Sequence, residues 1–520
     1  MSKNIILCSD GTGNKGGYGE DTNVYKLYKA VDIHNDKHPQ ITYYDNGVGA
    51  RENQNKYVQK LRKAFGLGFQ GNIGELYEFL ALNYNPGDAI YLFGFSRGGA
   101  TVRAFLGLLY ACGLVNRYDK DGKGKTIDQL QYDIKEALKS YEQISVSRQA
   151  VNDFKKDKAL HDDKYVPNGN LPIQFVGVWE TVSGLGFPND WSLAFSCFFR
   201  LLDNVSDKIW PHNYYDYELN ATIKNAYQAL SIDDERITFF PKVWDESAND
   251  FSGEVEQVWF SGMHSNIGGG YARTGLSDIT MDWMLVRATQ HGLVLKAGVE
   301  EFFKANADTY DRLYDSREGI ASYYRYGPRD IVQLSQTEKG KNKLKGKLKI
   351  HNTVMQRIEQ GTADYAPGML PNEFDVVETS LKSAVTHVQV DKEHTIWQDN
   401  KKQLLNYINQ REWLYRIFAE LSLAVVLISG FMWMNLNVVP QDQSGLNLFG
   451  RFFGHIADVL EYFTPAFFEN FIHYVIRVHS WIFIALVAVI MAMQRWREHL
   501  KHELSEVSKK LCHLLLQDYK

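Results

Sequence analysis

The chain has 520 residues, with 57 Lys and Arg side chains against 62 Asp and Glu and a formal net charge of -5. This near balance excludes the strong overall basic charge that is typical of nucleic-acid-binding proteins, and the length allows two or three domains with a sizeable core. The four cysteines are far apart and match no metal or redox spacing, so we expect reduced packing residues.

A short apolar strand close to the N-terminus runs into the glycine-rich loop Asp10–Gly17, and no long apolar stretch that would indicate a signal peptide precedes it. The loop lacks the complete phosphate-loop pattern. Its glycines allow close backbone approach, so backbone N–H groups near Gly11 or Thr12 are candidates for one arm of an oxyanion hole. An ordinary glycine-rich turn between a strand and a helix is the alternative.

Helices and strands alternate after this loop. The triplet Asp21-Thr22-Asn23 predicts the start of a helix that ends near Val31. Apolar periodicity then predicts a strand at 41–44, a helix at about 70–83 and a buried strand at 90–93. This order predicts an α/β fold with a mostly parallel sheet, helices on both faces and a site at the carboxyl ends of the strands.

The strand at 90–93 leads into Gly94-Phe95-Ser96-Arg97-Gly98, and a helical pattern follows as far as Leu109. The G-x-S-x-G spacing is typical of a nucleophile elbow, in which the glycines allow a tight turn between strand and helix. Ser96 is therefore the candidate nucleophile, and the backbone N–H of Arg97 is a candidate oxyanion donor. A chance match is the alternative. The reading also requires a histidine base and an acid elsewhere in the chain.

Three further regions follow this motif. Residues 115–170 are polar and helix-like and predict a helical insertion. The run Ile173–Trp179 predicts a buried strand that ends at Glu180, where the acid of a triad could lie. The segment Trp191–Trp210 is rich in aromatic residues, and it fits a lid, an acyl-chain contact surface or equally a part of the hydrophobic core.

The runs 237–240 and 257–260 also predict strands, and the second leads into a glycine-rich loop that contains His264. A histidine in a loop directly after a strand is well placed to act as a base. The order Ser96, Glu180, His264 along the chain is the serine, acid, histidine order of α/β hydrolases. We therefore predict His264 as the base, with a structural histidine as the alternative.

Four motifs carry a family resemblance: Ser9-Asp10-Gly11-Thr12-Gly13-Asn14, Gly94-Phe95-Ser96-Arg97-Gly98-Gly99-Ala100, Val176-Gly177-Val178-Trp179-Glu180-Thr181-Val182 and His264-Ser265-Asn266-Ile267-Gly268-Gly269-Gly270-Tyr271. Over about residues 4 to 375 the chain resembles the α/β-hydrolase family of the type VI secretion phospholipase effectors. The resemblance implies an esterase or phospholipase that cleaves acyl esters by a Ser-acid-His mechanism, with Ser96 as nucleophile and His264 as base.

The triad acid departs from the family pattern, because Glu180 stands where the family motif has Asp. A glutamate orients the imidazole in some hydrolases, so Glu180 is the first candidate. Its extra methylene leaves Asp10, Asp245 and Asp278 open as alternative acids. We expect no metal and no cofactor.

The C-terminal part contains two long stretches without a charged residue, Leu421–Gln441 and Val478–Gln494. Their lengths predict two transmembrane helices, at about 417–439 and 477–494, and a pair of core helices is the alternative. We therefore predict a catalytic core at 1–290, a mostly helical region at 291–410 that completes it, and a membrane anchor at 411–520 with a cytoplasmic C-terminal helix. The basic residues outside both stretches place the catalytic domain on the cytoplasmic side.

These observations predict a membrane-anchored serine lipid hydrolase that cleaves glycerophospholipid acyl esters. The alternatives are an esterase or thioesterase with a soluble acyl substrate, and a non-catalytic membrane scaffold that keeps a hydrolase fold. The expected partners are the phospholipid substrate and the bilayer, together with a regulatory protein partner or a second copy of the chain, but no nucleic acid. Secretion as an effector is the weaker alternative to a resident membrane protein.

Overall fold

The computed structural model describes residues 2–11, 14–47, 69–144, 147–161, 171–182, 216–248, 251–391, 393–434, 454–464 and 468–519. Thr12, the aromatic-rich segment 191–210 and residues 435–439 of the first predicted transmembrane helix lie outside these ranges.

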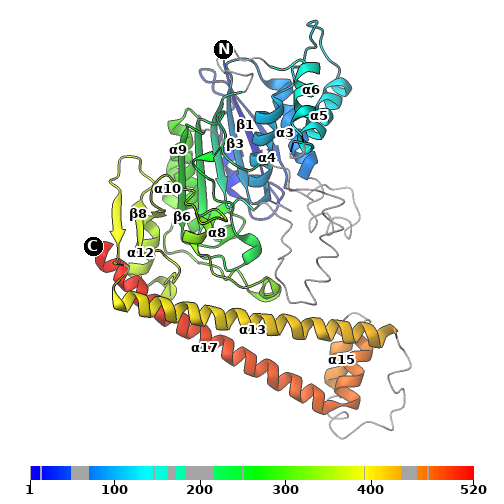
Figure 1. Cartoon of the computed structure of the whole chain (residues 1–520), viewed down its shortest axis with the longest axis vertical. Helices are drawn as coiled ribbons and strands as arrows, with labels where there is room; N and C mark the ends of the chain where they lie inside the picture. The colour runs from blue at the N-terminus through cyan, green and yellow to red at the C-terminus, as the bar shows by residue number, and fades with distance from the viewer. Residues whose placement is uncertain are drawn as a thin grey trace.

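Within the described residues, nine strands form a single sheet with the order β2-β1-β3-β4-β5-β6-β7-β8-β9 (Figure 1). Neighbouring strands from β2 to β8 are parallel, and only β9 is antiparallel to its neighbour. The strands are β1 (Asn4–Ser9), β2 (Gln40–Asp45), β3 (Ala89–Phe95), β4 (Ile173–Trp179), β5 (Asn225–Ser231), β6 (Glu254–Phe260), β7 (Lys349–His351), β8 (Glu373–Val377) and β9 (Thr386–Gln389). The predicted α/β fold with a mostly parallel sheet is confirmed.

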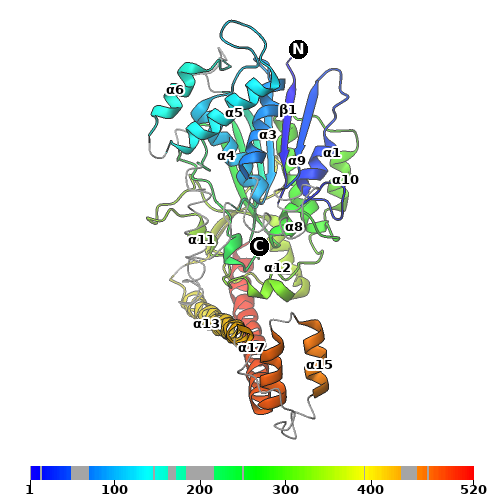
Figure 2. The same cartoon turned by 90° about the vertical axis from the view of Figure 1, so that its right-hand side faces the viewer.

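Helices cover both faces of this sheet, because alternate residues of each buried strand point to opposite sides. In β1, Ile5 and Leu7 belong to the apolar cluster under α3 (Phe69–Asn83) and α4 (Arg97–Cys112). Ile6 and Cys8 belong to the cluster on the other face, under α1 (Asn23–Ala30) and α9 (Gly275–Gln290). Figure 2 shows α5 (Ile127–Glu142) and α6 (Gln149–Asp157) on one side, and α1 and α10 (Val299–Asn306) on the other.

Several short elements connect these layers. They are η1 (Ile237–Phe239), α8 (His264–Gly268), η3 (Gly319–Tyr323), α11 (Ile331–Leu334), α12 (Asn352–Gln360) and η4 (Thr362–Asp364). The stretch 237–240, which the sequence predicts as a strand, is a single turn of 3₁₀ helix, whereas the unpredicted β5 lies in the middle of the sheet. The region 291–410 is less helical than predicted, since it supplies β7, β8 and β9. These strands have only three to five residues, which is too short for a periodic pattern to distinguish them from loops.

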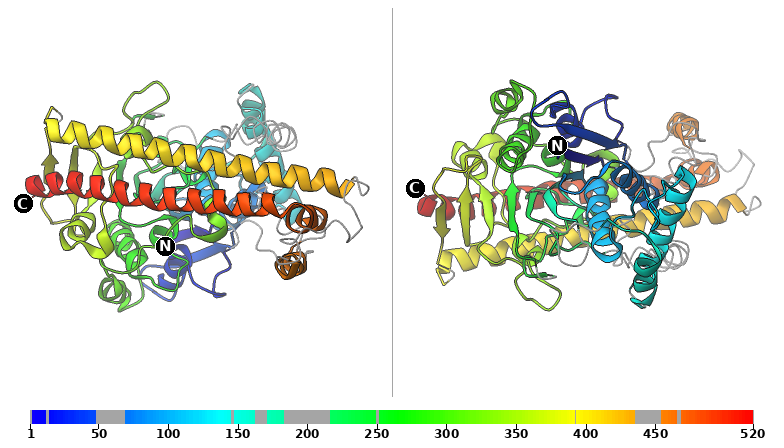
Figure 3. Two further views of the ribbon diagram at one scale, coloured as in Figure 1. Left: turned by 90° about the horizontal axis from the view of Figure 1, so that it is seen from below. Right: turned by 90° about the horizontal axis from the view of Figure 1, so that it is seen from above.

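Two helices of 40 residues each, α13 (Thr395–Met434) and α17 (Ser480–Tyr519), lie below the sheet (Figure 3), contact each other and diverge toward α15 (Gly454–Phe463) (Figure 1). Near the sheet they share an apolar cluster that includes Trp397, Leu404, Leu504 and Leu511. Their far ends contact α16 (Glu469–Ile472) and η8 (His473–Val478), and α15 packs against these two. The predicted second span and the predicted C-terminal helix are thus parts of one continuous helix, α17.

Candidate active site

Ser96 lies in a strained turn between β3 and α4. Its backbone angles are φ 57 and ψ -123. A residue other than glycine adopts such angles only when the surrounding structure holds it there. The two glycines of the motif have no room for a side chain: a Cβ atom on Gly94 would lie 2.7 Å from the carbonyl oxygen of Gly98, and one on Gly98 would lie 2.1 Å from that of Ser9. This is the geometry that a nucleophile elbow requires.

The turn lies where the order of the strands reverses. From β1 the chain continues to β2 on one side of β1, and then to β3 on its other side. Ligands of open α/β sheets bind at such a point, outside the carboxyl ends of the strands. The loop after β1 is therefore next to the elbow: a Cβ atom on Gly11 would lie 3.3 Å from the Cβ of Ser96.

His264 follows β6 at the same edge of the sheet and is the first residue of α8, rather than part of an irregular loop. Its Nδ1 lies 3.1 Å from Oε2 of Glu180. Its Nε2 is buried and has no hydrogen-bond partner among the described residues. The ring contacts Phe95, which precedes the nucleophile, with 4.7 Å between ring centroids, and it contacts Phe239 at 5.1 Å. The acceptor nitrogen that a serine hydrolase uses as its base is thus not occupied.

Arg329, which the sequence analysis missed, holds the carboxylate of Glu180. Nη1 and Nη2 of Arg329 each donate to one oxygen of Glu180 at 2.8 Å, and both side chains are fully buried. The same guanidinium donates to the carbonyl oxygens of Ser231 and Phe239, and the backbone N–H of Ser231 donates to Oε1 of Glu180. A paired, fixed carboxylate of this kind can orient an imidazole.

These contacts set the charges of the pair. Burial raises the pKa of the Glu180 carboxyl, but Arg329 and His264 lower it, and the net pKa is below the ordinary value. Burial lowers the pKa of His264, and the contact with Glu180 opposes this only in part. The site therefore contains an ionised acid beside a neutral imidazole, which are the protonation states that a general base needs.

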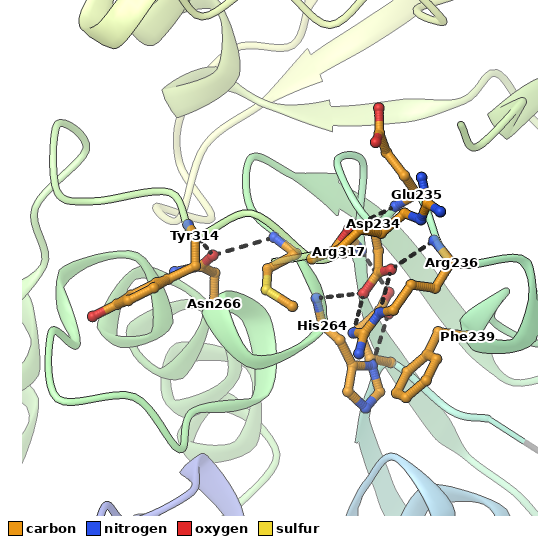
Figure 4. A network of polar contacts seen from close by, with 12 residues as sticks. Asp234, Glu235, Arg236, Phe239, His264, Asn266, Tyr314 and Arg317 are labelled. Atoms are coloured by element: carbon orange, nitrogen blue, oxygen red, sulfur yellow. Dashed lines mark hydrogen bonds and ion pairs between the residues drawn. The ribbon is translucent and has the colours of Figure 1, made fainter. Parts of the chain in front are cut away.

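A second layer of charges surrounds the histidine (Figure 4). The Asp234 carboxylate accepts from the backbone N–H of His264 at 3.3 Å, and it forms a bidentate pair with Arg236 at 2.9 and 2.6 Å. The guanidinium of Arg236 lies 3.6 Å from the ring centroid of Phe239, which covers His264. Asp234 and Arg236 thus contact the backbone of His264 and the aromatic ring that covers it. Asp234 and Arg236 belong to none of the motifs described in the sequence analysis.

The other candidate acids contact groups outside this pair. Asp10 is buried after β1, where it accepts from Tyr44, Thr22, Asn14 and the N–H of Gly11. Asp245 accepts from the backbone and hydroxyl of Ser247, and Asp278 from Lys26 and Thr274. Of the four candidate carboxylates, Glu180 is the one that the structure brings to His264.

The candidate oxyanion donors differ in their surroundings. Arg97 is the first residue of α4, and the first N–H groups of a helix have no acceptor within the helix. The N–H of Gly11 lies beside the elbow but donates to Oδ1 of Asp10 at 2.6 Å. Thr12 lies outside the described residues. In the part of the chain that the structure describes, no group of three or more His, Cys, Asp or Glu side chains could hold a metal ion.

Comparisons with known proteins give the family. An uncharacterized protein of Saccharomyces cerevisiae is 30% identical over 202 residues, which make up 36% of this chain and 28% of the yeast protein. The chain thus matches less than a third of the length of that curated relative. A crystal structure of an uncharacterized protein from Pseudomonas aeruginosa aligns with 81% of this chain over 60% of its own length, with 16% sequence identity. The TM-score of 0.32 is too low to support an argument.

The family model described as T6SS, Phospholipase effector Tle1-like, catalytic domain matches residues 3–287. This range contains the elbow, Glu180 and His264, whereas Arg329 follows it. Since the match covers more than half of the chain, the chain belongs to the Tle1-like family of type VI secretion phospholipase effectors, and this membership supports a phospholipase role.

Proposed function

We propose that this protein is a membrane-anchored serine phospholipase, in which Ser96, His264 and Glu180 form the triad. The observation that carries the proposal is the arrangement around His264: Nδ1 is held by a fixed carboxylate, while Nε2 is buried without a partner beside the turn that presents Ser96. Buried polar atoms usually have a hydrogen-bond partner, so an Nε2 that is unpaired among the described residues at this edge of the sheet supports a base that acts on Ser96.

The reaction follows from these positions. The Ser96 Oγ attacks the carbonyl carbon of an acyl ester while Nε2 of His264 takes its proton. Glu180 keeps the imidazole oriented and stabilises its charged form. The backbone N–H groups of Arg97 and Thr12 donate to the developing oxyanion, and that of Gly11 joins them on leaving Oδ1 of Asp10. The imidazolium returns the proton to the leaving lysophospholipid alcohol, and a water molecule then releases the fatty acid from Ser96 by the same steps.

The two long helices support the membrane location. Both contain an apolar window of transmembrane length, of which only 11% in α13 and 6% in α17 is buried inside the protein. A core helix of a soluble protein would have such a window largely buried. Exposed tryptophans mark both ends of the apolar part: Trp413 and Trp496 contact each other near the sheet, and Trp433 and Trp481 lie at the far ends. Tryptophan is enriched at membrane–water interfaces.

The length of α13 between its two exposed tryptophans fits a bilayer. Trp413 and Trp433 are 20 positions apart in the sequence, which is about 30 Å at about 1.5 Å per residue, close to the thickness of the hydrocarbon core. Arg411, Arg416, Arg495 and Arg497 gather at the end near the sheet. By the positive-inside rule this end, and with it the catalytic domain, faces the cytoplasm.

An active phospholipase at the membrane of its own cell is toxic, so we infer control by a protein partner or by assembly with a second copy. The substrate then reaches Ser96 from the leaflet beside the domain. Transfer into another cell, as the family name implies, is the alternative to residence in this membrane.

The decisive experiment measures fatty-acid release from mixed phospholipid vesicles by the purified chain and by Ser96→Ala, with free fatty acid and lysophospholipid resolved by mass. We expect release by the wild type and none by the variant. Hydrolysis of short-chain soluble esters without hydrolysis of vesicles favours an esterase or thioesterase. A Ser96 that no fluorophosphonate probe labels, in a protein that cleaves neither substrate, identifies a non-catalytic scaffold.

A further inference from the structure

A cavity of about 220 Å³ lies where α13 and α17 leave the catalytic domain, against the segment 316–326. Three arginines line it, Arg317, Arg411 and Arg497, and its apolar lining includes Phe418, Ile490 and Met493. We call it the interfacial cavity. It is distinct from the candidate active site, since neither Ser96 nor His264 lines it.

The two kinds of lining residue lie at different levels along the helices. The ring contact between Trp413 and Trp496 fixes the register of the antiparallel pair α13 and α17. Arg411 and Arg497 are therefore on the side of the catalytic domain, whereas Phe418 and Ile490 lie about 10 Å further along, on the apolar side. One cavity thus joins a cationic end to an apolar end.

The cationic end has more positive charge than its acidic neighbours balance. Arg411 forms a bidentate pair with Glu235, at 3.0 and 3.1 Å. Arg317 donates from Nε and Nη2 to backbone carbonyl oxygens, and Arg497 has no acidic partner among the described residues. Burial lowers the pKa of Arg317; Glu235 and Tyr415 raise it, whereas Arg411 and Arg497 lower it, and the net pKa is below the ordinary value. An anion at this place would relieve the repulsion between the guanidinium groups.

Size and position identify the kind of anion. A volume of about 220 Å³ is below the range of about 300–1,000 Å³ that is common for small-molecule pockets, so the cavity fits a headgroup and not a whole lipid. The tryptophan pair marks the level of the membrane surface, where the phosphates of a bilayer lie. A free phosphate ion would use the arginines but would leave the apolar end in contact with water.

We propose that the interfacial cavity binds one anionic glycerophospholipid, whose headgroup phosphate contacts Arg497 and Arg317 and whose upper acyl chain lies against Phe418, Ile490 and Met493. This inference rests on the membrane location proposed above, but not on catalysis. The bound lipid is a ligand distinct from the substrate, because neither Ser96 nor His264 lines the cavity.

The test uses the full chain with Ser96→Ala, so that no lipid is consumed, in a neutral detergent. Native mass spectrometry then counts bound lipid during titration with phosphatidylglycerol or with phosphatidylcholine of the same acyl chains. We expect one equivalent of phosphatidylglycerol to bind at least tenfold more tightly than phosphatidylcholine. Equal binding of the two lipids overturns the proposal. Because the readout is binding, a protein that hydrolyses nothing still gives a clear answer.

Three variants localise the site. Arg497→Gln should weaken the binding of phosphatidylglycerol at least tenfold, whereas the matched control Arg495→Gln, which removes the same charge two positions away and outside the cavity lining, should change it less than twofold. Met493→Trp fills the apolar end without a change of charge and should also abolish tight binding. Equal effects of Arg497→Gln and Arg495→Gln refute a specific site. Displacement of the lipid by an equal concentration of glycerol 1-phosphate shows that a small phosphate, not a lipid, is the ligand.

Discussion

Replacement of Arg329 by methionine tests how Glu180, the proposed triad acid, is held. The variant keeps most of the side-chain length but leaves the fully buried Glu180 carboxylate with only the Ser231 N–H and His264 as partners. Loss of one member of a buried ion pair destabilises a protein by about 3–5 kcal/mol. At about 2–4 °C per kcal/mol for a domain of 150–250 residues, the melting temperature in detergent should fall by about 10 °C.

The same variant should change the pH dependence of hydrolysis, which a purely structural role would not do. Without Arg329, burial dominates and the pKa of Glu180 rises above its ordinary value. The carboxylate then becomes protonated as the pH falls, so kcat should show an acidic limb at a higher pH than in the wild type. A loss of orientation also lowers kcat on the order of 10²-fold, with less effect on KM.

Two further variants complete the experiment. Arg329→Lys keeps the charge without the two parallel hydrogen bonds, and it should have intermediate stability and activity. The double variant Arg329→Met with Glu180→Gln removes both charges, so it should recover most of the stability but none of the activity. If Arg329→Met melts within about 2 °C of the wild type and its pH profile overlays that of the wild type, the argument for a held acid is wrong.

Three shorter predictions follow from other residues. Gly98→Ala places a Cβ atom 2.1 Å from the Ser9 carbonyl oxygen, so the elbow must open, and both the melting temperature and fluorophosphonate labelling should fall; a labelled, stable variant contradicts this geometry. Because the pKa of His264 lies below 6.5, kcat/KM of the wild type should fall only below pH 6.5. An inflection of kcat/KM above that pH is incompatible with His264 as a buried base. Burial raises the pKa of Asp233 from 3.8 to about 7. The protonated carboxyl therefore stabilises the fold below about pH 4, and this stabilisation, up to about 4 kcal/mol, is lost as the pH rises through about 7. Asp233→Asn should flatten this loss in melting curves between pH 5 and pH 8, and a variant with the slope of the wild type excludes Asp233 as its source.

Motifs with fixed local chemistry were the predictable part of this protein. The strand, serine and glycines around Ser96 specify one tight turn, and Thr22 caps its helix as its side chain suggests. Long amphipathic or apolar runs, such as α3 and the apolar part of α13, also have patterns that a sequence displays directly.

Contacts between distant parts of the chain were not predictable in this way. Arg329 is 149 positions from Glu180 and belongs to no motif, because nothing in a single sequence pairs one buried arginine with one buried acid. The choice of Glu180 over Asp10 depended on which carboxylate the sheet brings to His264, and this is a property of strand order. The strands β7 to β9 were missed because their burial comes from neighbours such as α12 and α17 and not from their own length.

The second half of α17 has a consequence for how the protein is made. Its residues Leu504, Leu511 and Leu515 complete the apolar cluster beneath β7 to β9, and Asp518 accepts from the backbone N–H of Gln389 at the edge strand β9. The ribosome synthesises this helix after the whole sheet and after both apolar stretches. The sheet can therefore finish packing only after both apolar stretches have been made. With the membrane location proposed above, this order of synthesis would couple the completion of the fold to insertion into the bilayer.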